Sequence, residues 1–164
     1  MSPSWPKSQT SERKMPREEN IKAVQLAAQR FSAKNLEAYL ELYDGGVLHH
    51  GFGNIRRGIA GLREHFHQLL QGFPNLRIDS QDIFGDGEKV AHRYTFYGTH
   101  TGEYLGYAAT GKFIVAPGVL LHLFERGKCV EVWHVIDNAR FLVGLGGLSS
   151  TPNARSDEPP PALK

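Results

Sequence analysis

The chain has 164 residues, which is enough for one domain with or without tails. Lys and Arg number 19 and Asp and Glu 17, and the formal charge of +2 is too small to indicate a nucleic-acid or acidic-membrane partner. Hydrophobic residues make up 40% of the chain, which excludes wholesale disorder, and the single cysteine, Cys129, excludes a disulfide framework and a cysteine-rich metal site.

The two ends differ in composition from the middle. Prolines and serines gather there and large aliphatic residues are few, so residues 1–18 and 150–164 are expected to be disordered tails around one domain, residues 19–149. No apolar run approaches the roughly 18 residues of a membrane span, and the first residues lack the apolar stretch of a signal peptide. We therefore expect a cytoplasmic protein without a membrane partner.

The first part of the domain has helical periodicity. Apolar residues recur at three- and four-residue steps over residues 21–31, behind Asn20 as a possible N-cap, and this spacing predicts a helix. A second, shorter stripe covers residues 36–43 with Asn35 able to cap it. The run Asp44-Gly45-Gly46 is expected to end this helix, because glycine is common where a helix stops.

A short strand and a third helix are predicted next. Residues 47–50 begin with two apolar residues and are expected to form the short strand. The glycine-rich stretch 51–54 is expected to end this strand. Apolar residues at helical spacing over residues 59–73 predict the third helix, closed by Gly72 and Pro74.

From Leu76 onward the pattern is that of β-strands. Residues 76–84 and 89–97 flank Gly85-Asp86-Gly87, which is a strong hairpin signal. An apolar segment at residues 141–145 closes the domain. The other expected strands and the turns between them are residues 112–116, Pro117-Gly118, 119–124, Arg126-Gly127 and 128–137.

Helices followed by a run of hairpin-linked strands predict an α+β fold with a mainly antiparallel sheet. Three short helices are too few to cover both faces of such a sheet. One face is therefore expected to curl around the helices and leave a pocket, and the other to meet water or a second subunit.

Several local motifs carry a resemblance to a known family. They are His50 before the glycine-rich loop, Arg57-Gly58 at the start of the third helix, Gly98-Thr99-His100-Thr101-Gly102, and the spacing from Trp133 to Asp137. With this order of elements, residues 20–147 resemble the SnoaL-like polyketide (ester) cyclases of the NTF2-like superfamily. The resemblance implies a cone in which N-terminal helices pack in a curved, mainly antiparallel sheet.

The resemblance also implies an activity. The family's acid/base in an intramolecular aldol closure is an aspartate at the end of the last strand, which corresponds to Asp137, and its assisting histidine corresponds to His122. The substrate would be a hydrophobic, polyketide-like small molecule, and no metal or organic cofactor would be required. The alternatives are a non-catalytic small-molecule-binding protein, or an isomerase, dehydratase or epoxide hydrolase on the same scaffold.

Each proposed catalytic residue has a structural alternative. Asp137 could instead be the N-cap of a final helical turn. His122 could be a histidine at the edge of the core, satisfied by Glu131. His50 could hydrogen-bond a substrate carbonyl or its enolate, or could simply face solvent. The predicted substrate-binding residues are Trp133, Glu131, Phe52, Phe66, His100 and Tyr104.

Alternation along the last two strands tests which side chains share a face. If Arg126-Gly127 is a two-residue turn, His122 lies opposite Glu131, and Leu120 lies opposite Trp133. We therefore expect His122, Glu131, Trp133 and Asp137 on the pocket side. The other face would carry Val130, Val132 and Ile136, and an apolar outer face predicts a homodimer or higher homo-oligomer.

The eight histidines do not form a metal motif. They are scattered over expected helices, loops and strands, and neither His-x-x-x-His nor His-Glu-x-x-His occurs. No metal site is predicted.

Overall fold

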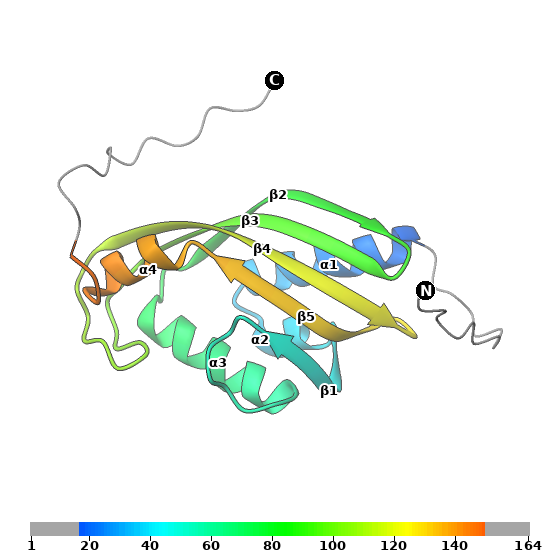
Figure 1. Ribbon diagram of the computed structural model, residues 1–164, viewed down its shortest axis with the longest axis horizontal. Coiled ribbons are helices and arrows are strands. Elements are labelled where there is room, and N and C mark those ends of the chain that lie inside the picture. Colours follow the sequence, from blue (N-terminus) through cyan, green and yellow to red (C-terminus); the bar gives the residue numbers. More distant parts are fainter. Residues whose placement is uncertain (1–16, 150–164) are drawn as a thin grey trace, which may run out of the picture.

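The computed structural model describes residues 17–149 (Figure 1). The helices are α1 Arg17–Ser32, α2 Leu36–Leu40, α3 Ile59–Gly72 and α4 Asn138–Leu145. The strands are β1 Tyr43–His50, β2 Arg77–Asp86, β3 Lys89–Thr99, β4 Phe113–Glu125 and β5 Lys128–Ile136.

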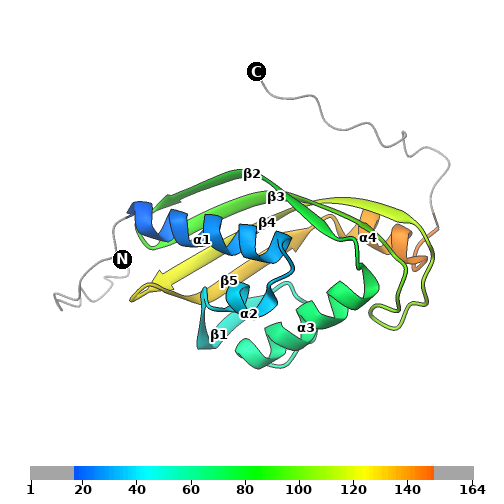
Figure 2. The same ribbon diagram turned by 180° about the vertical axis from the view of Figure 1, so that it is seen from behind.

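The five strands form one curved, unclosed sheet in the order β1-β5-β4-β3-β2. The pair β1–β5 is parallel and the other three pairs are antiparallel. Helix α1 lies along β2 and β3 on the inner face of the sheet, and α3 packs beside β1 (Figure 2). Helix α4 packs on the first residues of β4, where Gly144 lies against Ile114. The predicted α+β fold, with helices held in a mainly antiparallel curved sheet, is confirmed.

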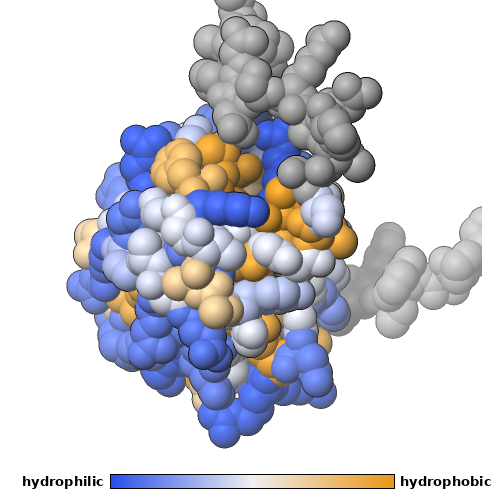
Figure 3. Space-filling model, turned by 90° about the vertical axis from the view of Figure 1, so that its left-hand side faces the viewer, coloured by the Kyte–Doolittle hydropathy of each residue, from blue (hydrophilic) through white to orange (hydrophobic). Residues whose placement is uncertain are grey.

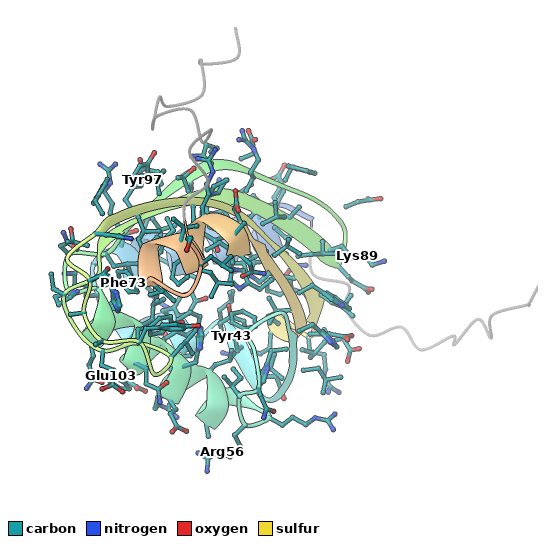
Figure 4. All side chains as sticks on the ribbon, turned by 60° about the vertical axis from the view of Figure 1, so that its left-hand side comes forward. Tyr43, Arg56, Phe73, Lys89, Tyr97 and Glu103 are labelled. Carbon is teal, nitrogen blue, oxygen red and sulfur yellow. The ribbon has the colours of Figure 1, made fainter. Side chains whose placement is uncertain are left out.

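The core fills the space between the helices and the inner face of the sheet. Tyr43 and Phe73 lie in this space, whereas Tyr97 lies on the other side of the sheet (Figure 4). Aromatic side chains pack edge to face here, as between Phe31 and Phe66, whose ring centroids are 5.2 Å apart.

Helix α1 begins earlier than expected. It starts at Arg17, so residues 17 and 18 belong to the helix and not to the predicted tail. Asn20 is inside the helix and is not its N-cap. Its buried side-chain amide donates a hydrogen bond of 3.0 Å to the Gly87 carbonyl, which ties α1 to the β2–β3 turn. The rest of the predicted tails, residues 1–16 and 150–164, lies outside the described residues.

Asn35 caps α2 as predicted, because its side-chain oxygen accepts the Ala38 N–H at 3.2 Å. The run Asp44-Gly45-Gly46 does not end this helix: α2 stops at Leu40, and the run lies inside β1. β1 pairs with β5 at Tyr43 and again from Leu48, so the glycines that local preference assigns to a turn lie in an irregular stretch between two paired parts of the strand.

Pro117-Gly118 is not a turn either. β4 runs without interruption from Phe113 to Glu125, with Thr95 opposite Pro117 and Tyr94 opposite Gly118. The predicted strands 112–116 and 119–124 are therefore one strand. β3 pairs with this stretch on one side and β5 pairs with it from Gly118 onward, and this pairing outweighs the turn preference of the dipeptide.

The predicted register between β4 and β5 is wrong beyond the first pairs. Glu125 faces Lys128 and Phe124 faces Cys129, as a two-residue turn at Arg126-Gly127 requires, but Leu123 then faces Glu131. Val130 is an extra residue, a β-bulge. Since side chains alternate, one extra residue moves every later side chain of β5 to the opposite face.

The bulge reverses the predicted faces of β5. Val132 is fully buried and Ile136 lines the inner cavity, so neither belongs to an outer apolar face. The exposed large apolar side chains of β4 and β5 are instead Phe113, Val119, Leu121 and Val135. The homodimer stays a prediction.

No helix among residues 17–149 is long and apolar enough to cross a membrane. Seen from the end that carries α4 and the β3–β4 connection, the surface is mainly hydrophilic with separate apolar patches (Figure 3). Exposed apolar side chains of these segments are Leu105, Phe113 and Leu148.

Candidate active site

An internal cavity of about 420 Å³ lies between the helices and the inner face of the sheet. Its wall is built by the four helices α1 to α4, the loop after β1, strands β2 to β5 and the β3–β4 connection. Aromatic and aliphatic side chains dominate the wall, among them Phe31, Phe52, Phe66, Phe96, Leu120 and Phe141. A mainly apolar hollow of this size is typical of a small-molecule site.

Four histidines line the cavity: His65 from α3, His92 from β3, His122 from β4 and His134 from β5. Burial lowers the pKa of each imidazole to about 4. All four are therefore uncharged at neutral pH and can accept or donate hydrogen bonds without placing a charge in the apolar wall.

Hydrogen bonds orient these rings. His122 Nδ1 lies 3.3 Å from the Val90 carbonyl, which assigns the proton to Nδ1 and leaves Nε2 as the acceptor. His92 Nε2 lies 2.8 Å from the Ser80 hydroxyl. The ring of His122 is thereby held with an unprotonated nitrogen, which is the form required of a base.

Three tyrosines add hydroxyl groups to the wall: Tyr39, Tyr94 and Tyr104. Burial raises the pKa of each phenol, so all three keep their protons at neutral pH. The Tyr39 hydroxyl is bonded to that of Tyr43 at 2.7 Å, and the Tyr94 hydroxyl lies 2.5 Å from His134 Nε2.

Charged side chains are confined to the mouth of the cavity, where Arg56 and Glu64 are both exposed. Leu105 also belongs to the mouth, and its side chain is 56% exposed. It is held at φ +52° in the tight turn that pairs Tyr104 with Tyr107. An apolar side chain in a left-handed conformation is costly and gives the rim a fixed apolar edge.

Four of the predicted site residues line the cavity: Phe52, Phe66, Tyr104 and His122. Phe52 comes from the glycine-rich loop and packs on His134, with ring centroids 4.7 Å apart. His122 is not satisfied by Glu131, the alternative considered from the sequence, because its partner is the Val90 carbonyl.

His50, Glu131 and Trp133 form a separate cluster on the outer face of the sheet, away from the cavity. His50 Nε2 lies 2.8 Å from Glu131 Oε1, and its ring stacks on Trp133 with centroids 5.2 Å apart. The expectation that Glu131 and Trp133 share the pocket face with His122 is therefore wrong. The bulge at Val130 is the physical cause.

Asp137 ends β5 and is the N-cap of α4. Its Oδ1 accepts the Arg140 N–H at 3.1 Å, and its Oδ2 lies 3.1 Å from Arg140 Nε. This is the structural alternative considered from the sequence. Its neighbours Ile136 and Asn138 both line the cavity, so Asp137 lies beside the cavity while its carboxylate is directed to the helix.

His100 is fully buried outside the cavity wall. Its ring stacks on Phe73 with centroids 5.2 Å apart, and its Nδ1 lies 3.1 Å from the Thr110 hydroxyl. Thr110 in turn donates to the Gly144 carbonyl at 2.8 Å. The Gly-Thr-His-Thr-Gly motif thus fastens the β3–β4 connection to α4.

No group of three or more His, Cys, Asp or Glu side chains within residues 17–149 is arranged to hold a metal ion. The sequence interpretation missed the cavity residues Tyr94, His65, His92 and His134. The signal for Tyr94 and His134 was Pro117-Gly118, since a glycine within a strand marks close approach by another group.

No curated protein sequence matches the chain. Among solved structures, AclR of Streptomyces galilaeus, a proposed hydroxylase, is 25% identical with a TM-score of 0.74, and the match covers 84% of this chain and 87% of AclR. IdmH of Streptomyces antibioticus, a proposed polyketide cyclase, is 24% identical with a TM-score of 0.66, over 77% and 98% of the two chains.

A proposed SnoaL-like polyketide cyclase from Jannaschia sp. CCS1 is 18% identical with a TM-score of 0.72, over 85% and 99% of the two chains. IdmH and the Jannaschia protein are less than 25% identical to this chain, so they show only that it shares their fold, the NTF2-like cone. The family model described as SnoaL-like polyketide cyclase matches residues 21–143, nearly the whole described domain with its cavity. The chain therefore belongs to the SnoaL-like polyketide cyclase family.

Proposed function

We propose that this protein is a cofactor-independent polyketide cyclase that closes a ring by an intramolecular aldol reaction inside the cavity. Family membership supports a polyketide cyclase role. The observation that carries the proposal is the cavity itself, which combines an apolar wall with uncharged imidazole and phenol groups. Such a wall can fold an apolar chain and move protons within it.

The chemistry fits acid/base groups alone. A carbon between two carbonyls loses a proton to a base, and the resulting enolate attacks a second carbonyl of the same molecule. A positioned acid or base contributes roughly 10²–10⁴ in rate, and the fixed geometry of a bound chain contributes further. The aromatic side chains of the wall favour a flat, partly aromatic substrate.

Asp137 is the first candidate for the base, on the strength of the resemblance. Its carboxylate lies between two cavity-lining residues, Ile136 and Asn138. Serving as the base would require it to turn away from the α4 N-terminus and Arg140, which it contacts in the structure.

His122 is the candidate that the cavity favours. Its side chain lines the cavity, and its Nδ1 is bonded to the Val90 carbonyl, so Nε2 is the free acceptor. His50, the third predicted catalytic residue, lies on the outer face, where it contacts Glu131 and Trp133 and not the cavity wall.

The test is ring closure on a panel of linear and partly cyclised polyketide methyl esters, followed by mass-resolved chromatography. We expect the wild type to turn over at least one ester, and either Asp137→Asn or His122→Gln to reduce that rate by about 10² or more. Loss only in Asp137→Asn identifies the carboxylate as the base, and loss only in His122→Gln identifies the imidazole.

Two results would contradict the proposal. Turnover that is equal in the wild type and both variants would remove both base assignments. Tight binding of panel members without any product would favour the binding-protein alternative. His50→Gln is the matched control, because it removes an imidazole from the outer face and should leave turnover unchanged.

A further inference from the structure

Tyr94 and His134 form a hydrogen-bonded pair in the cavity wall. The Tyr94 hydroxyl and His134 Nε2 are 2.5 Å apart, and both side chains line the cavity. They come from β3 and β5, which are not neighbours in the sheet, because β4 runs between them. The pair therefore spans an intervening strand.

Gly118 makes this crossing possible. It faces Tyr94 in the β3–β4 register, and a Cβ atom at position 118 would lie 2.6 Å from both the Tyr94 hydroxyl oxygen and Cζ. Any side chain at this position would push the phenol away from β4. The glycine within β4 thus has a specific effect, since it lets the Tyr94 ring lie across the strand and reach His134.

The protonation of the pair follows from its surroundings. His134 Nδ1 is buried and has no hydrogen-bond partner within residues 17–149. The Gly51 backbone lies near the ring but makes no well-aligned hydrogen bond with Nδ1. A proton on Nδ1 would therefore be a buried donor without an aligned acceptor, and it is better placed on Nε2, where it is donated to the Tyr94 oxygen. The Tyr94 O–H is then free to donate to a molecule in the cavity.

Burial keeps both groups uncharged. It lowers the pKa of His134 to about 4, with the nearby His65 contributing, and it raises the pKa of Tyr94. The phenol therefore retains its proton at neutral pH and is a donor.

We propose that Tyr94, oriented by His134, donates a hydrogen bond to the substrate oxygen on which negative charge develops during enolate formation. This inference rests on the proposed function and deepens it: the substrate class is a carbonyl compound that ionises to an enolate with its oxygen at Tyr94. Tyr94 is a catalytic residue in this assignment, and His134 is a positioning residue.

The step balances without any further reactant. The base takes the proton from the carbon, and the C–H electron pair forms a carbon–carbon double bond as the carbonyl oxygen becomes negative. Tyr94 donates a hydrogen bond to this oxygen and keeps its proton. The enolate carbon then bonds to the second carbonyl carbon, whose oxygen takes the proton from the protonated base.

The test uses 4-nitrophenol as the probe, because its phenolate mimics an enolate and the phenol and phenolate absorb at different wavelengths. Its affinity is measured by titration above and below its own pKa, which gives the preference for phenolate over phenol. We expect Tyr94→Phe to reduce this preference about tenfold to a hundredfold, the usual effect of one hydrogen bond to a charged group.

Tyr97→Phe is the matched control, since it removes a hydroxyl from the same strand, β3, on the other side of the sheet from the cavity. His134→Phe should reduce the preference as Tyr94→Phe does, and His134→Gln, which can still donate to Tyr94, should restore part of it. Circular dichroism checks that each variant is folded.

The inference is overturned if Tyr94→Phe and Tyr97→Phe change the preference equally, or if the wild type has no preference that depends on Tyr94. Since binding needs no turnover, the outcome is separate from that of the proposed function. A Tyr94-dependent preference without ring closure on any ester would leave this site standing and remove the cyclase assignment.

Discussion

At the scale of single residues, Asp137 is a side chain with a clear role in folding and a proposed role in chemistry. Its oxygens accept the Arg140 N–H and pair with the Arg140 guanidinium at the start of α4. Asn caps a helix about as well as Asp, whereas Ala does not. Substitution can therefore separate the cap from the carboxylate.

We expect Asp137→Ala to lower the free energy of unfolding by about 1 kcal/mol, because the α4 cap is lost. Asp137→Asn should change it by only a few tenths of a kcal/mol, since the cap survives and an exposed ion pair with Arg140 contributes little. Urea unfolding followed by circular dichroism measures both. Equal losses in the two variants would show that the charge, and not the cap, stabilises this end of the domain.

At the scale of elements, β4 shows how sheet pairing overrides a local turn signal. Pro117-Gly118 reads as a turn on its own, but partners on both sides hold it in a 13-residue strand. Gly118 is required because the Tyr94 ring lies against it and leaves no room for a side chain, and not because the chain bends there.

Gly118→Ala should lower the free energy of unfolding by about 1–3 kcal/mol, the usual cost of forcing extra volume into a packed site. The cost should largely disappear in a Tyr94→Ala background, where the ring that meets the new methyl group is gone. A double-mutant cycle by chemical denaturation measures this coupling. An unchanged cost in the Tyr94→Ala background would place the strain in the β4 backbone instead.

The β4–β5 pair shows that the alternation of side chains along a strand does not always predict which face each residue occupies. The two-residue turn at Arg126-Gly127 was predicted correctly, yet the faces of Glu131 and Trp133 were not. Nothing in the sequence around Val130 predicts a bulge. One extra residue there is enough to exchange the inner and outer faces of the rest of β5.

At the scale of the whole molecule, four uncharged histidines in one cavity link stability to pH. Each has a folded-state pKa of about 4, below the ordinary value of 6.5. Between these values the unfolded chain binds protons that the folded protein does not. Stability is therefore fully present above pH 6.5 and is lost as the pH falls toward 4.

A shift of this size is worth about 3 kcal/mol for one histidine, so four together approach the total stability of a typical domain. We expect cooperative acid unfolding between pH 6.5 and 4, measured by urea unfolding at a series of pH values. His65→Gln should make the dependence shallower. His67→Gln, an exposed histidine on the same helix, is the control and should not. A stability that stays constant across this range would mean that the cavity admits charged imidazoles.

The sequence by itself determined most of the helices and strands, the α+β class and the family, because hydrophobic periodicity and turn residues act over a few neighbours. It also placed Phe52, Phe66, Tyr104 and His122 among the site residues, and these line the cavity. Only the tertiary structure decided which side of β5 faces inward and that Tyr94 meets His134 across Gly118. Those outcomes depend on one bulge and on contacts between residues distant in the chain, and local preferences do not encode either.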